Sequence, residues 1–289
     1  MIARIAPPDE RAWSEADAAD TLSSVIPIEE RFPRPSVMGV VNVTPDSFSD
    51  GGVNLDPDTA AASARRMLEE GATIVDVGGE STRPGSGGVT ADEELRRVVP
   101  VLERLAGEIP VSIDTSKAEV ARRAIGIGAE MVNDVTALRA DPELAGVIAE
   151  SGVHLCLMHM QGDPRTMQID PRYEDVASEV AAFLEQRLAF AVSEGIREDA
   201  ICLDPGIGFG KTVEHNLELI RRLDVLLALG RPVLIGFSRK STLARLGATD
   251  IRSASIAAAL AAYERGATII RAHDVGPHVD ALSVARALA

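Results

Sequence analysis

The chain has 289 residues, 46% of them hydrophobic, and a net charge of −15 at neutral pH. This length fits one α/β barrel with a sizeable core, and the negative charge argues against nucleic acid or an anionic membrane as a partner. No apolar run approaches the ~20 residues that span a bilayer, and the acidic N-terminus with its two early prolines does not resemble a signal peptide. We therefore predict a cytoplasmic protein.

Short apolar runs alternate with longer segments of helical period along the chain. Because most runs are apolar at nearly every position, they predict strands of a parallel sheet that is covered on both faces. Eight such runs in this length favour a closed (β/α)8 TIM barrel, an α/β fold, over an open sheet. The predicted strands are 37–43, 73–77, 111–113, 131–133, 153–158, 201–203, 232–235 and 268–271, and the clearest predicted helices are 59–70, 93–105, 176–193, 215–229 and 253–264.

The first 35 residues precede the first predicted strand. We expect them to form a short N-terminal extension against the bottom of the barrel, with residues 36–289 as a single barrel domain. Cys156 and Cys202 each fall inside an apolar run. A disulfide between them is one interpretation, but two buried thiols are favoured in a cytoplasmic protein.

Polar or ionisable residues follow every predicted strand. In a barrel of parallel strands, function lies at the carboxyl ends of the strands, so these side chains are candidates for one site. Asp and Asn are also common wherever a loop begins, which explains any single position but not eight in succession. The residues are Asn42, Asp76, Asp114, Asn133 with Asp134, His159, Asp204, Ser238 with Lys240, and Arg271 with His273.

Three of these residues suit a flat heterocycle. Asp114, Asn133 and Asp204 come from three different strands and are predicted to point into the mouth of the barrel. A carboxylate accepts two N–H groups side by side, and an aminopyrimidine ring offers such a pair.

Cationic side chains lie across the same mouth. Arg271 and His273 alternate along the eighth strand and can face one side, and with Arg83 and Lys240 they form the local positive cluster that an acidic protein needs to bind phosphate. The amide oxygen of Asn42 beside bound phosphates is compatible with Mg²⁺, which takes few protein ligands.

Lysine is scarce. The chain has 26 arginines and only three lysines, Lys117, Lys211 and Lys240, all just after predicted strands at the active face. Because a compact ammonium does not replace a planar guanidinium, this bias indicates positions where arginine would not serve. Chance retention remains the alternative, more for Lys117 and Lys211 than for Lys240.

Seven segments carry a family resemblance. Residues 38–52 (MGVVNVTPDSFSDGG) closely resemble the first signature of dihydropteroate synthases, and residues 76–85 (DVGGESTRPG) resemble the second. The remaining segments follow in the family's order at 112–115, 132–135, 203–211, 236–240 and 271–275. The resemblance covers residues 36–289, and its first two motifs are long enough to be highly specific.

The resemblance implies roles for individual residues. It implies a pterin site at Asp114, Asn133, Asp204 and Lys240, with Asp76 and Met158 at other pocket positions. It implies diphosphate binding by Asn42, Arg271 and His273, with Mg²⁺ alongside. It implies a p-aminobenzoate pocket formed by the loops 44–56 and 79–90, with Phe48, Thr82, Arg83, Pro84, Phe209 and Ser241 at matching positions.

The implied reaction joins 6-hydroxymethyl-7,8-dihydropterin diphosphate to p-aminobenzoate. The family's reaction is described as dissociative: diphosphate leaves, the pterin stabilises the remaining cation, and the amine attacks it. Lys240, Asp114, Arg83 and Asp204 are the predicted catalytic residues, and a homodimer through the later helices is implied. The alternative for the alanine-rich segment 253–264 is that it packs against its own barrel alone and makes no contact with a second subunit.

Other interpretations remain. The segment 206–212 resembles a nucleotide-binding loop, but Pro205 stands where that motif needs glycine. His159 and His215 lack partners at metal-site spacing, so ordinary polar roles are favoured. Pterin-binding methyltransferases use a similar barrel, but the two long loop motifs and the segments 238–240 and 271–273 favour a synthase. A non-catalytic pterin-binding paralogue is a further alternative, which the intact loop motifs disfavour.

Overall fold

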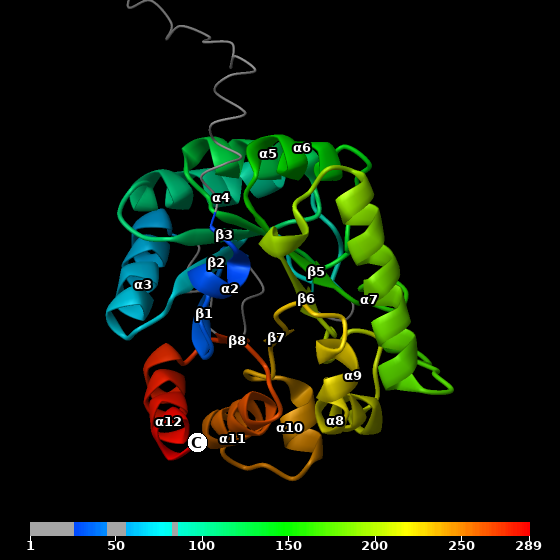
Figure 1. The fold of residues 1–289 in the computed structure, drawn as a ribbon. Coiled ribbons are helices and arrows are strands. Elements are labelled where there is room, and N and C mark those ends of the chain that lie inside the picture. The colour runs from blue at the N-terminus through cyan, green and yellow to red at the C-terminus, as the bar shows by residue number, and fades with distance from the viewer. Residues whose placement is uncertain (1–25, 45–55, 83–85) are drawn as a thin grey trace, which may run out of the picture.

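The computed structural model describes residues 26–44, 56–82 and 86–289. Eight parallel strands form one sheet in the order β6-β5-β4-β3-β2-β1-β8-β7. A parallel bridge between Leu203 and Val233 joins β6 to the segment before β7, so the sheet closes on itself. Figure 1 shows the helices as a ring around these strands. The predicted (β/α)8 TIM barrel is confirmed.

The strands are short, as barrel strands are. Their bounds are β1 Ser36–Asn42, β2 Ile74–Gly78, β3 Val111–Asp114, β4 Met131–Asp134, β5 His154–Met158, β6 Ile201–Asp204, β7 Leu234–Ile235 and β8 Ile269–Ala272. The helices are α2 Ile28–Arg31, α3 Pro57–Glu69, α4 Ala91–Leu105, α5 Ala118–Ile127, α6 Leu144–Ser151, α7 Val176–Ser193, α8 Val213–Arg221, α9 Leu223–Leu227, α10 Ser241–Arg245, α11 Ile251–Glu264 and α12 Val275–Leu288, with the 3-10 turn η2 Glu198–Ala200.

Four helices begin two residues before their predicted start, and capping explains the difference. Asp56, Thr90, Thr212 and Asp250 precede α3, α4, α8 and α11, and each side chain accepts the backbone N–H of the third helical residue. That capped residue is the predicted start in every case. The helices therefore begin where their caps place them, two residues before the apolar period becomes visible.

One predicted helix is wrong in its extent. The segment 215–229 divides into α8 and α9 because Arg222 lies between them with φ −111° and ψ 38°, outside the helical region. Helices α2, α5, α6, α10 and α12 were not among the predicted helices. No helix within the described ranges is long and apolar enough to cross a membrane.

The lower half of the barrel interior is apolar. Nine buried side chains from strands and from α2 form one cluster there: Ile28, Phe32, Met38, Ile74, Met131, Cys156, Cys202, Leu234 and Ile269. Ile28 and Phe32 belong to the described part of the predicted extension, and α2 lies over this end of the barrel in Figure 1. Both cysteines are free and buried, as favoured from the sequence.

Candidate active site

Two residues further along the same strands, the barrel interior becomes polar. Because side chains of a strand alternate between its faces, positions two apart point to the same side. Ile74 is followed by Asp76, Met131 by Asn133, Cys202 by Asp204 and Ile269 by Arg271. We call the apolar cluster the lower layer, and Asp76, Asn133, Asp204 and Arg271 together with Asp114 the upper layer.

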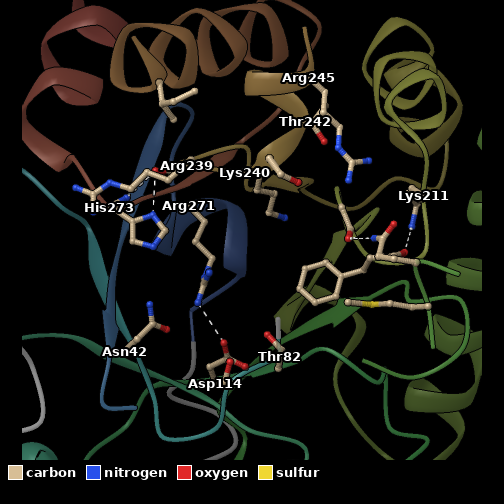
Figure 2. A pocket seen from close by; sticks show the side chains of 18 of the residues that line it. Asn42, Thr82, Asp114, Lys211, Arg239, Lys240, Thr242, Arg245, Arg271 and His273 are labelled. Carbon is tan, nitrogen blue, oxygen red and sulfur yellow. Dashed lines mark hydrogen bonds and ion pairs between the residues drawn. The ribbon is translucent and has the colours of Figure 1, made fainter. Parts of the chain in front are cut away.

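A cavity of about 890 Å³ lies above the upper layer, at the carboxyl ends of the strands. Figure 2 shows side chains from several strand ends converging on it. Nine residues predicted from the sequence line it: Asn42, Thr82, Asp114, Phe209, Ser238, Lys240, Ser241, Arg271 and His273. The structure thus brings together most of the predicted site, from segments as far apart as β1 and β8.

An arginine ties three acidic or amide side chains together beneath this cavity. Arg271 donates from Nε to Asp76 Oδ2 at 2.8 Å and from a terminal nitrogen to Asp114 Oδ2 at 3.1 Å. The same Asp76 oxygen accepts the Asn133 amide at 2.9 Å. Figure 2 shows the Arg271 side chain reaching toward Asp114. Asp76 and Asn133 are therefore buried behind Arg271 and do not line the cavity themselves.

Several acceptors in this network have no hydrogen-bonding partner within the described ranges. They are Asp76 Oδ1, Asn133 Oδ1 and Ser112 Oγ, all fully buried. A buried acceptor without a donor costs free energy, so native proteins rarely leave several together. A ligand that brings N–H groups to this point would satisfy them.

Asp114 is held in an unusual electrostatic environment. Burial first, and then the neighbouring Asp76 charge, raise the pKa of Asp114, and the Arg271 guanidinium opposes them. This environment therefore favours a proton on the Asp114 carboxyl group at neutral pH. A ligand that donates two N–H bonds would favour the ionised form instead.

Asp204 and Met158 lie to one side of this network. Asp204 Oδ1 accepts the Gly206 N–H at 2.7 Å, and burial raises the pKa of Asp204 while the Lys240 charge opposes the shift. Met158 is buried in a cluster with Phe209 at its edge. Neither Asp204 nor Met158 is among the residues that line the cavity.

Lys240 lines the cavity, and its charge interacts with that of Asp204. Its ammonium donates to the Ile207 carbonyl and lies 4.9 Å from the centre of the Phe209 ring. Burial lowers the pKa of Lys240 to about 8, against the attraction of Asp204, and the Arg271 charge lowers it further. This lysine can therefore change protonation near neutral pH.

The rim of the cavity is rich in cations. His273 Nδ1 lies 3.0 Å from Ser238 Oγ, which holds the ring at the carboxyl end of β8. Beside it, Arg239 forms a bidentate ion pair with Asp274, at 2.8 and 3.1 Å. Lys240, Arg245, Arg252 and Arg271 also line the cavity. An acidic protein thus concentrates positive charge at one place, as the sequence predicted for an anion site.

The base of the predicted second loop is anchored by charge. Lys117 forms ion pairs with Glu80, which lines the cavity, and with the buried Glu94. Thr82 lines the cavity just beyond. The remaining predicted p-aminobenzoate residues, Phe48, Arg83 and Pro84, lie outside the described residues.

Two strand-end or nearby residues, Asp134 and His215, have structural roles. Asp134 accepts two backbone N–H groups and one hydroxyl within its own loop, from Thr136 and Leu138. His215 completes the capping box of α8. Within the described ranges, no group of three or more His, Cys, Asp or Glu residues is placed to hold a metal.

Sequence reasoning missed several lining residues. Glu80, Gln168, Arg239 and Thr242 line the cavity from loops or helix starts. Lys211 lines it too, and the scarcity of lysine had marked that position without assigning it a role.

Comparisons with known proteins now identify the family. A family model described as pterin binding enzyme matches residues 38–273. A dihydropteroate synthase from Neisseria meningitidis serogroup C is 48% identical over 263 residues, which cover 88% of this chain and 93% of that protein. The chain belongs to the dihydropteroate synthase family.

Solved structures of dihydropteroate synthases share the fold. A structure from Yersinia pestis, described as a sulfonamide drug complex, superposes with a TM-score of 0.85 at 44% identity and covers 89% of this chain and 95% of that chain. Xanthomonas albilineans dihydropteroate synthase with 4-aminobenzoic acid gives 0.82 at 47% identity, covering 89% and 94%. The same enzyme in complex with 7,8-dihydropteroate gives 0.79 at 44%, with the same coverage.

Proposed function

We propose that this cavity condenses 6-hydroxymethyl-7,8-dihydropterin diphosphate with p-aminobenzoate to give 7,8-dihydropteroate and diphosphate. The observation that carries the proposal is the upper layer: acceptors from separate strands converge beneath a cationic rim. The relatives support it, since the Xanthomonas albilineans synthase is described with 4-aminobenzoic acid and with 7,8-dihydropteroate. The chain is accordingly a transferase of folate synthesis.

The pterin ring would bind against the upper layer. For the ring to reach Asn133, the Arg271 side chain would turn away from Asp76 toward the diphosphate at the rim. The ring and amino N–H groups would then be accepted by Asp114, Asp204 and the free oxygen of Asn133. Lys240 would donate to a ring acceptor, because its ammonium is at the cavity, where its contacts among the described residues are the Ile207 carbonyl and the Phe209 ring. Asp76 would keep the Asn133 amide in place.

The diphosphate would bind at the rim. Arg271 lies on β8, His273 directly follows the strand, and both side chains line the cavity. Their charge and hydrogen bonds would stabilise the negative charge that develops on the leaving group.

Magnesium fits the donor set at this point. Asn42 lines the cavity at the end of β1, and its amide makes no hydrogen bond to another described residue. Mg²⁺ takes one or two protein oxygens and completes its shell with phosphate oxygens and water, so Asn42 with the substrate diphosphate would suffice. When bound, the ion supplies positive charge that stabilises the leaving diphosphate.

The bond changes are simple. The bond between the exocyclic carbon and the diphosphate oxygen breaks, and its electron pair leaves with diphosphate. The lone pair of the p-aminobenzoate nitrogen forms the new C–N bond, and that nitrogen then loses a proton. Arg271 and His273 would hold the leaving group, and the side chains around Phe209 and Thr82 would exclude water from the electron-deficient carbon.

Incubation of the chain with pterin diphosphate, p-aminobenzoate and Mg²⁺ tests the proposal. We expect equal amounts of dihydropteroate and diphosphate, loss of turnover when a chelator removes Mg²⁺, and loss of pterin binding in Asp204→Asn. Pterin binding without condensation would identify a non-catalytic paralogue. Methyl transfer from a folate donor, with no condensation, would identify a methyltransferase.

We further infer a cytoplasmic homodimer. An apolar groove lies between α8, α10 and α11 and includes Leu246, whose side chain is half exposed. The alanines of α11 would let a second copy approach closely. Light scattering on the purified chain measures the mass: twice the chain mass of 30.5 kDa supports the dimer, and the chain mass itself contradicts it.

A further inference from the structure

Lys211 is a buried cation without an ion-pair partner. Its side chain, 2% exposed, follows β6 and lines the cavity. Its ammonium has two hydrogen-bonding partners, His159 Nδ1 at 2.9 Å and the Phe209 carbonyl at 3.0 Å. Neither is an anion, and no carboxylate of the described residues forms an ion pair with it.

The imidazole beside it is neutral. Burial, and then the Lys211 charge, lower the pKa of His159 to about 2, so Nδ1 accepts the lysine proton. Burial lowers the pKa of Lys211 to about 7, while Asp204 opposes the shift and Lys240 adds to it. An isolated buried charge destabilises a fold, so its presence needs another reason.

The turn between β6 and α8 suggests where that reason lies. Side chains from several surrounding elements hold its backbone polar groups. Four side chains donate hydrogen bonds to backbone carbonyls of the turn: Lys240 to Ile207, Gln168 to Gly208, Lys211 to Phe209 and Tyr173 to Gly210. The Asn216 side chain accepts the Gly208 N–H. The turn is thereby fixed with Phe209 against the cavity.

We propose that Lys211 is a positioning residue of the pterin site: held by neutral His159, it fixes the Phe209 carbonyl from behind and supplies a second positive charge to Asp204. The proposal rests on the proposed function, because it assumes that Asp204 accepts N–H groups of the pterin. It adds a second cation that acts on Asp204 through space and comes from a different turn than Lys240.

The charges around Asp204 explain how this acts. Lys240, Arg271 and Lys211 all favour its ionised form, against burial. The charged groups that act on Lys211 are Asp204 and Lys240. His159 and the Tyr173 ring lie beside its ammonium, and the Lys211 charge also acts on His215. Only the ionised carboxylate accepts two N–H bonds, so a second cation maintains pterin recognition at lower pH.

Lys117 provides the matched contrast. It is also a lysine just after a strand, but it forms ion pairs with Glu80 and the buried Glu94. Removing Lys117 would leave a buried carboxylate without its cation. Removing Lys211 would leave no such charge behind.

The test compares Lys211→Met, Lys211→Gln and Lys117→Met with the wild type. Thermal melting and the Kd for pterin diphosphate with Mg²⁺, without p-aminobenzoate, are measured from pH 5.5 to 8.5. We expect Lys211→Met to melt at or above the wild-type temperature and to bind about tenfold more weakly near pH 6. The difference should shrink above pH 7, where the wild-type lysine loses its own proton. Lys117→Met should melt at a lower temperature.

Lys211→Gln separates the two parts of the proposal. It keeps a donor for Phe209 but lacks the charge, so it should share the pH dependence of Lys211→Met with a smaller loss of affinity, and it replaces Lys211→Met if that variant does not fold. Affinities within twofold of the wild type at every pH, or a melting temperature lowered as much as by Lys117→Met, would overturn the proposal. A wild type that binds no pterin would instead refute the proposed function, and this inference with it.

Discussion

The two layers of the barrel interior lie two residues apart on the same strands and solve opposite problems. The lower layer is apolar and fully buried, and its side chains need no partners beyond each other. The upper layer contains three carboxyl groups, one amide and one guanidinium, with acceptors that no described residue satisfies. Apolar burial in the lower layer thus stabilises the fold, whereas the upper layer has acceptors that a ligand would pair. Variants in the two layers should separate these roles.

Arg271→Met should have the largest effect, because this side chain serves both needs. Its removal leaves Asp76 and Asp114 without their shared cation, which should lower the free energy of unfolding by about 3–5 kcal/mol. Activity should also fall sharply, because the diphosphate loses its guanidinium. Denaturant unfolding and steady-state kinetics measure the two losses. Adding Asp76→Asn should restore much of the stability and none of the activity; recovery of both would contradict the separation.

Ile74→Ala tests the lower layer directly beneath Asp76. Truncation of this fully buried side chain should lower the free energy of unfolding by about 2–5 kcal/mol, because it leaves a cavity among well-packed neighbours. The activity per folded molecule should stay close to the wild type. Ile74→Val, as the control, should cost about 0.5–1.5 kcal/mol. Loss of activity in the folded fraction of Ile74→Ala would show that the layers are not independent.

Asp114→Asn reverses that pattern. Activity should fall about 100-fold, because an amide cannot accept two N–H bonds side by side as a carboxylate does. Since burial raises the pKa of Asp114, the folded state binds its proton more tightly than the unfolded state does, and stability falls as pH rises from about 4. The variant should remove that fall and unfold at higher denaturant concentration near pH 7. Wild-type turnover in this variant would refute its role.

The smallest expected effect concerns the pH dependence of Lys240. Its pKa is lowered to about 8, so pterin diphosphate should bind more weakly as pH rises through 8, by at most about tenfold per pH unit. Stability should change the other way: above pH 8 the unfolded state holds this proton more tightly, so stability rises with pH until the unfolded lysine titrates. Lys240→Gln should abolish both trends, and an unchanged affinity profile in that variant would assign the titration elsewhere.

Much of the barrel was predictable because strands leave a local signal. Apolar runs located all eight strands within one or two residues, and polar strand ends marked the active face. The two short halves α8 and α9 were not separable, since no glycine or proline marks the break at Arg222. The two extra residues at the start of four helices depend on caps such as Asp56, which precede the apolar period.

The sequence predicted which residues belong to the site better than it predicted how their side chains contact one another. Sequence placed Asp76 and Asn133 at strand ends, but only the structure shows Arg271 lying between them and the cavity. Lysine scarcity marked Lys211, but its partner His159 lies 52 residues earlier on the neighbouring strand end. Contacts between distant segments depend on which way long side chains turn, and composition carries no record of that.

A structure of the chain with bound pterin diphosphate tests the central claim most directly. The account predicts the ring above the lower layer, with its N–H groups on Asp114, Asn133 and Asp204 and its diphosphate at Arg271 and His273. A pterin bound elsewhere, with those acceptors still facing one another unoccupied, would contradict it.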